Sequence, residues 1–109
     1  MIKATFFSYN DNYYSFIIEG HANHGFSGND IICAAVSSAV DMTINAIKNI
    51  IKEDCFLNIN PSKAEVYLKM KNKTSEKASL FIQSLYNHLL NISEAYPDNV
   101  KVKNKLGKE

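Results

Sequence analysis

The sequence contains no arginine, and all 12 of its basic residues are lysines. Arginine supplies the planar, bidentate donor fork on which much base and phosphate recognition depends. The formal net charge is only +1, although lysines gather at 69–77 and 101–108. We interpret these runs first as a solvated strand face and a charged tail, so binding of nucleic acid is not expected. The alternative is that these lysines form a weak, positively charged binding surface for nucleic acid.

Cysteine is scarce, with two residues, Cys33 and Cys55. If a helix connects them, its rise places them roughly 30 Å apart. A disulfide requires Cα atoms only about 4.4–6.8 Å apart. Both cysteines are therefore expected to be free thiols in a reducing compartment.

Long hydrophobic runs are also lacking. A membrane helix needs roughly 20 predominantly apolar residues. The best stretch, 31–40, is interrupted by Ser37 and Ser38 and followed by Asp41. The first residues alternate too much for a signal peptide. We therefore expect a cytoplasmic protein without a membrane partner, folded as one domain over residues 1–109.

The remaining pattern predicts seven elements. Alternating residues indicate strands, turn residues separate them, and apolar residues at helical spacing indicate helices. The expected strands are 2–9, 13–19, 56–59, 65–71 and 100–102, and the expected helices are 30–52 and 75–95. The short connections favour hairpins. The fold class is thus α+β: a single layered domain with a mainly antiparallel sheet and two helices, in the order β-β-α-β-β-α-β.

One histidine and one cysteine lie at the ends of neighbouring elements. Gly20-His21 follows the second expected strand, and Cys33 lies near the start of the first expected helix. Asp30 is a good N-cap for that helix, which makes Cys33 its third residue. Unpaired N–H groups and the helix dipole at that point favour an anion such as a thiolate. The layout therefore permits a nucleophilic Cys–His pair.

The spacing alone leaves other interpretations open. Cys33 can be a buried structural cysteine beside an incidental loop histidine. Ser37 lies on the same helix face as Cys33, either bonding near the thiol or simply packing. Asp30 can cap the helix or orient His21. A zinc set of His21, His24, Asp30 and Cys33 is conceivable, but no paired-cysteine spacing supports it, so no metal is expected.

Two segments resemble a known family, the ribosomal-processing cysteine protease family, Prp. Its signature has a Gly-His pair, a short variable loop and then Asp-Ile-Val-Cys-Ala-Ala-Val-Ser. This chain has Gly20-His21 and then Asp-Ile-Ile-Cys-Ala-Ala-Val-Ser over 30–37, with Ile32 in place of valine. Tyr96-Pro97-Asp98, followed by Val-Lys-Val, is similar to the family's C-terminal strand.

The resemblance implies a cysteine endopeptidase that removes a short N-terminal extension from a large-subunit ribosomal protein of the L-twenty-seven family. It implies Cys33 as nucleophile and His21 as general base, with Asp30, Ser37 and Gly20 in supporting positions. It further implies a homodimer, no cofactor, and a mobile substrate loop, whose residues are Ala22, Asn23, His24, Gly25, Phe26, Ser27, Gly28 and Asn29.

An alternative from a different class is a non-catalytic, ribosome-associated or RNA-binding module on the same fold. The lysines within 65–77 are its support. A thiol redox protein is disfavoured because the sequence has no Cys-x-x-Cys motif and Cys55 is far from Cys33.

Overall fold

The computed structural model describes residues 1–21 and 27–107, with the backbone alone for 27–30. The chain forms β1 (Ile2–Tyr9), β2 (Asn12–Glu19), α1 (Ser27–Asn45), a π-helical turn η1 (Ala46–Ile50), β3 (Cys55–Asn60), a 3₁₀ turn η2 (Pro61–Lys63), β4 (Glu65–Met70), α2 (Glu76–Ala95) and β5 (Val100–Leu106). This confirms the predicted order β-β-α-β-β-α-β and the α+β class.

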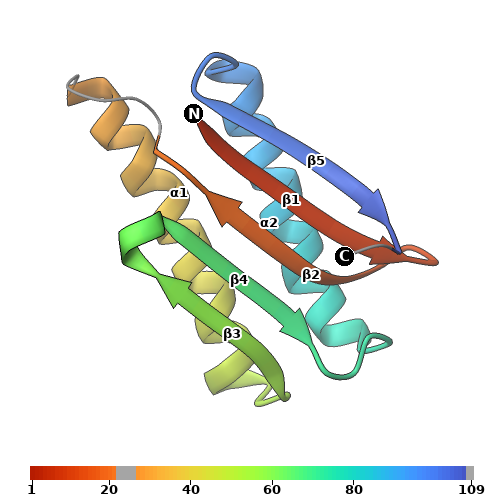
Figure 1. Cartoon of the computed structure of the whole chain (residues 1–109). Coiled ribbons are helices and arrows are strands. Elements are labelled where there is room, and N and C mark those ends of the chain that lie inside the picture. The colour runs from red at the N-terminus through yellow and green to blue at the C-terminus, as the bar shows by residue number, and fades with distance from the viewer. Residues whose placement is uncertain (22–26, 108–109) are drawn as a thin grey trace.

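The five strands form one sheet in the order β3-β4-β2-β1-β5 (Figure 1). β1 pairs antiparallel with β2, β2 with β4, and β4 with β3. β5 lies parallel to β1, because α2 carries the chain back along the sheet before β5 begins. The sheet is thus mainly antiparallel, as predicted, and the first and last strands are neighbours.

The β1–β2 hairpin closes through Asn10 and Asp11, whose φ angles are 51° and 63°. Two successive left-handed residues make the type I′ turn that suits a two-residue hairpin, and Asn and Asp tolerate that conformation well. Beyond the turn, Ser8 pairs with Tyr13 and Phe7 with Ser15, so Tyr14 is an extra residue in β2. This bulge turns Tyr13 toward α2, where its ring lies 5.5 Å from that of Tyr86.

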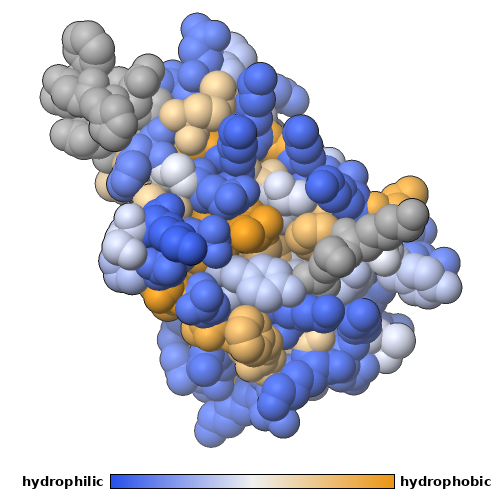
Figure 2. Space-filling view, in the orientation of Figure 1, coloured by the Kyte–Doolittle hydropathy of each residue, from blue (hydrophilic) through white to orange (hydrophobic). Residues whose placement is uncertain are grey.

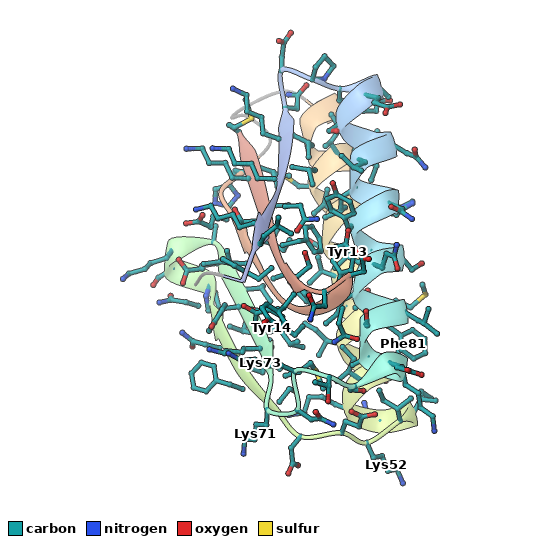
Figure 3. The ribbon with its side chains drawn as sticks, turned by 90° about the vertical axis from the view of Figure 1, so that its right-hand side faces the viewer. Tyr13, Tyr14, Lys52, Lys71, Lys73 and Phe81 are labelled. Carbon is teal, nitrogen blue, oxygen red and sulfur yellow. The ribbon has the colours of Figure 1, made fainter. Side chains whose placement is uncertain are left out.

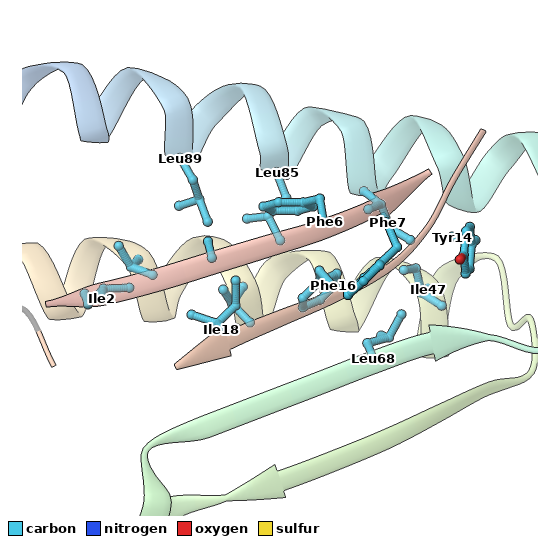
Figure 4. Close-up of a cluster of buried hydrophobic side chains, with 14 of the residues drawn as sticks. Ile2, Phe6, Phe7, Tyr14, Phe16, Ile18, Ile47, Leu68, Leu85 and Leu89 are labelled. Carbon is cyan, nitrogen blue, oxygen red and sulfur yellow. The ribbon is translucent and has the colours of Figure 1, made fainter. Parts of the chain in front are cut away.

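Both helices cover the same face of the sheet, and the core lies between them and the strands (Figures 1 and 4). Phe6 and Phe16 are fully buried, with ring centroids 5.9 Å apart. The apolar residues at helical spacing that predict the second helix are Ala78, Phe81, Ile82, Leu85, Leu89 and Ile92. Ala78, Ile82, Leu85 and Leu89 are buried, as expected of a core stripe, whereas Phe81 is exposed. Burying a leucine, isoleucine or phenylalanine side chain contributes about 1.5–3 kcal/mol, so this layer supplies much of the folding free energy.

Ser75 caps α2. Its hydroxyl accepts a hydrogen bond from the N–H of Ala78 at 3.2 Å. The helix ends at Ala95, and Tyr96 precedes Pro97, which disfavours helical geometry in the residue before it. The predicted boundaries of this helix are confirmed.

The first helix begins earlier than predicted. The sequence placed its start at Asp30, but α1 begins at Ser27, so Gly28 and Asn29 are helical rather than part of a loop. Glycine lowers helix propensity but does not forbid a helix, and this explains the error. The α-helix ends at Asn45 and continues as a π-helical turn to Ile50.

The segment 31–50 is long and apolar enough, by length and composition, to cross a membrane. The expectation that no stretch has this character was therefore wrong. A core helix passes the same test, and Ile32, Val36 and Val40 are buried in the sheet–helix layer. The outer side of the helix is different, since Ile31 and Met42 are 70% and 72% exposed.

The other face of the sheet is not covered by any of the elements described above. Figure 2 shows it as largely hydrophilic, with apolar side chains near its centre. Lys101, Lys103 and Lys105 are exposed along β5. Figure 3 shows Tyr14 and Lys73 on this side, away from the helices, and the Lys73 ammonium lies 5.1 Å from the centre of the Tyr14 ring.

Candidate active site

Gly20 directly follows β2, in a conformation that requires glycine. Its φ is +90°, and a Cβ at this position would overlap the carbonyl oxygen of Met1. Its N–H donates to the carbonyl of Ala64 at 2.9 Å, and the ammonium group of Met1 donates to the carbonyl of His21. His21 therefore leaves the sheet at a point anchored by the first residue and by the β3–β4 connection.

Cys33 comes from α1 and is half-buried against the core. It and His21 line the same pocket, which has a volume of about 270 Å³. The end of β2 and the N-terminal part of α1 are thus adjacent in space, as the sequence predicted. Cys33 and His21 therefore share one cleft.

The pocket has an apolar lining and a more polar rim. Its apolar part is formed by Ile2, Ile18, Val36, Ile59 and Val66, and its remaining lining residues are Gly20, His21, Cys33, Ser37, Asn60, Pro61, Ala64 and Glu65. A peptide segment entering this cleft loses water against the apolar side chains. The cleft therefore brings a bound chain close to both groups.

Ser37 lies one helical turn beyond Cys33, is exposed, and lines the same pocket. The predicted placement on the thiol's helix face is confirmed. Cys33 itself is the seventh residue of α1 rather than the third, because the helix begins at Ser27. The dipole effect falls off within the first turn, so the helix terminus is a weaker source of thiolate stabilisation than the sequence suggested.

Asp30 is the fourth residue of α1, and the predicted N-cap role is wrong, because the helix starts three residues earlier. Its side chain is not described, so its use in orienting His21 stays a prediction. Ser27, Gly28 and Asn29 belong to α1, whereas Ala22, Asn23, His24, Gly25 and Phe26 lie outside the described residues.

The zinc alternative depends partly on His24, which lies outside the described part of the chain. The side chain of Asp30, another member of that set, is not described either, and within 1–21 and 31–107 no group of three metal-ligating side chains converges. Cys33 and Cys55 are both free thiols, as predicted. Cys55 begins β3, and burial raises the pKa of its thiol. A thiol with a raised pKa is a poor nucleophile at neutral pH.

Sequence reasoning missed the part of the pocket that comes from the β3–β4 connection. Asn60, Glu65 and their neighbours were expected only as a hairpin. Their place beside His21 follows from the strand order β3-β4-β2, which sets Glu65 opposite Glu19. No local pattern shows that β4 pairs with β2.

Larger hollows lie elsewhere on the molecule. One of about 500 Å³ is lined by Tyr9, Tyr14 and Lys73 among others, and one of about 370 Å³ lies between α1 and α2. Neither is lined by a cysteine. The smaller cleft is the candidate active site because of the groups it brings together, not because of its size.

A thiol and an imidazole in one pocket, with a hydroxyl one helical turn further, are the groups that a thiol-dependent hydrolase uses. Comparison with known proteins agrees with that class. The model of the family described as cysteine protease Prp matches residues 1–101. The chain belongs to this family and is a cysteine-type peptidase.

Several relatives are similar over most of their length. The ribosomal processing cysteine protease Prp of Bacillus subtilis is 30% identical over 107 residues, covering 94% of this chain and 96% of that protein. The corresponding Staphylococcus aureus protein is 29% identical over 89 residues, covering 82% of this chain and 84% of its own.

Solved structures of relatives share the fold. The essential S. aureus ribosomal processing protease Prp has been solved with a covalently linked product peptide. It has a TM-score of 0.87 and 26% identity, covering 96% of this chain and all of that chain. The same protease with a substrate peptide gives a TM-score of 0.86 at 25% identity, with the same coverage. A Streptococcus mutans protein gives 0.86 at 28% identity, covering 97% of this chain and 98% of its own.

Proposed function

We propose that this chain is an endopeptidase that removes a short N-terminal extension from a ribosomal protein of the L-twenty-seven family. Cys33 is the nucleophile and His21 the general base. The observation that carries the proposal is the single pocket lined by both residues. The names of the relatives, which are ribosomal processing proteases, and the peptides bound in two of their structures support it.

The chemistry divides into two half-reactions. The His21 imidazole takes the thiol proton while the Cys33 sulfur attacks the scissile carbonyl carbon, giving a tetrahedral intermediate. That intermediate collapses to a thioester, and the imidazolium gives its proton to the leaving amine. Water then attacks the thioester with His21 again acting as base, which releases the new carboxylate and restores the thiol.

We infer that Ser37 assists the first step. Its hydroxyl is exposed at the rim of the pocket, one turn from the nucleophile. A hydroxyl in that position can donate a hydrogen bond to the substrate or to the oxyanion. The unpaired backbone N–H groups of a helix are in its first turn. Cys33 lies beyond that turn of α1, so a side-chain donor such as Ser37 is needed more.

The proposal is tested with the unprocessed ribosomal protein from the same organism, after confirming that it carries an extension. Incubation with the purified protein should shorten it once, at its N-terminus, as read from intact masses. A substrate whose mass stays unchanged over many enzyme equivalents would count against the proposed activity. Cleavage at several internal sites would contradict the proposed specificity.

We also propose that the enzyme is a homodimer joined through the outer face of its helices. This face has small residues on α1, notably Ala35 and Ser38, beside the 72%-exposed Met42. Apart from His88, the residues lining the groove between α1 and α2 are uncharged. Small side chains let the helix of a second copy approach closely, and burying Met42 removes apolar surface from water.

Sedimentation velocity tests the dimer. The wild type should sediment as a dimer at micromolar concentration, and Met42→Glu should sediment as a folded monomer, because it buries a charge in the contact. Leu106→Glu is the matched control, since Leu106 is 77% exposed at the end of β5. A wild-type monomer, or a dimer unaffected by Met42→Glu, would contradict this interface.

A further inference from the structure

Glu65 begins β4 and lines the pocket that contains Cys33 and His21. Among the described residues of that lining, it is the one with a carboxylate. The residue is half-buried rather than fully exposed. A charge beside apolar walls is screened less than one in free solvent, so it attracts a cation more strongly. Glu65 is therefore positioned to sense the charge of a bound peptide.

The strand register leaves this carboxylate without a cation across the sheet. Glu65 lies directly opposite Glu19 on β2, and its other cross-strand neighbour is Asn60. Glu19 has Lys3 opposite it on its far side. Like charges directly opposite one another destabilise a sheet. Lys3 offsets only one member of this pair, and the register places no described cation opposite Glu65.

Glu65 also marks where the pocket meets the uncovered face of the sheet. It shares that face with Glu19, since residues paired across strands point to the same side. The next residue, Val66, is among the apolar side chains of the pocket. A peptide that leaves the Cys33–His21 cleft over this end of the sheet passes Glu65.

We propose that Glu65 is a specificity-determining residue whose carboxylate binds a lysine or arginine side chain of the peptide substrate at the mouth of the Cys33–His21 pocket. The inference rests on the proposed peptidase function, because it concerns the chain that Cys33 cuts. Glu65 takes no part in bond breaking. Its contribution is to binding, so it acts mainly on KM.

The test uses a family of peptides that span the cleavage site and differ at one position, which carries lysine, glutamine or glutamate. The varied position is moved in turn along both sides of the scissile bond. The enzymes are the wild type, Glu65→Gln and Glu65→Lys. Glu53→Lys is the control, because it changes the net charge equally but lies at the opposite end of β3 from Asn60.

At one position the wild type should prefer lysine over glutamate by about tenfold in kcat/KM, as expected for a partly desolvated ion pair. The preference should reside in KM and shrink between 0.1 and 1 M salt, where the Debye length falls from about 10 to 3 Å. Glu65→Gln should abolish it and Glu65→Lys should invert it. Glu53→Lys should keep it.

The proposal is overturned if Glu65→Lys keeps the wild-type preference at every position, or if it slows all three peptides equally. A wild type that cuts none of the peptides would contradict the proposed function instead. Glu65 is then judged by fluorescence anisotropy of the same labelled peptides with Cys33→Ala and with Cys33→Ala combined with Glu65→Lys. If Glu65→Lys inverts the order of the affinities for the lysine and glutamate peptides, the proposed binding of a cationic side chain by Glu65 is supported. If the two variants show equal affinities, the proposal is overturned.

Discussion

Cys33→Ala should abolish cleavage of the ribosomal precursor, lowering kcat by at least about 10⁴-fold, because removing a nucleophile removes the covalent pathway. The pocket should stay intact, because the substitution removes only the sulfur atom and keeps the Cβ. The variant should therefore still bind the precursor. The rate is measured from intact masses under single-turnover conditions, and binding from a pull-down of the uncut precursor.

Cys55→Ala is the matched control for this experiment. Cys55 is also half-buried and also a free thiol, but it lies at the start of β3, outside the candidate active site. The raised pKa of its thiol makes it a poor nucleophile. Its substitution should leave turnover near the wild-type rate. Equal losses in the two variants, or wild-type cleavage by Cys33→Ala, would refute the assignment of the nucleophile.

His21→Ala should lower kcat by about 10²–10⁴-fold with a smaller change in KM, as expected for loss of a general base. The backbone around residue 21 is held by Gly20 and Met1, so alanine should not displace it. Two measurements check the role: single-turnover cleavage, and the rate at which iodoacetamide alkylates Cys33. Both should fall, because the imidazole no longer takes the thiol proton.

Added imidazole provides a direct check on His21→Ala. The cavity left by the missing ring opens into the pocket, so a free imidazole can enter and restore part of the rate. His88→Ala is the matched control, since His88 is exposed on α2 and lines the groove between the helices instead. A His21→Ala enzyme with normal kcat and raised KM would show that His21 binds substrate rather than moves a proton.

The parts of the fold that depend on local chemistry were predictable. Asn10 and Asp11 give a hairpin turn, and Ser75 gives a helix cap, because each acts through its own backbone neighbours. The meeting of His21 and Cys33 was predictable for a similar reason. They lie at facing ends of consecutive elements, β2 and α1, so one connection sets their distance.

The parts that depend on distant pairing were not predictable. β5 was expected to end at Val102 but extends to Leu106, because its whole length pairs in parallel with β1. Glu65 reaches the pocket only because β4 pairs with β2 across a long intervening segment. The start of α1 was misjudged because Gly28 looks like a loop residue when its surroundings are unknown.

The pairing of the first strand with the last also has a consequence for how this enzyme is made. Ile2 lines the candidate active-site pocket, its N–H donates to the carbonyl of Asn99 at 2.8 Å, and it pairs with Val100. During synthesis the two hairpins can form early, but β1 keeps an open edge until β5 leaves the ribosome. The wall beside Cys33 is therefore completed among the last events of folding. A growing chain cannot assemble the full cleft until Asn99 and Val100 have been translated and have left the ribosome.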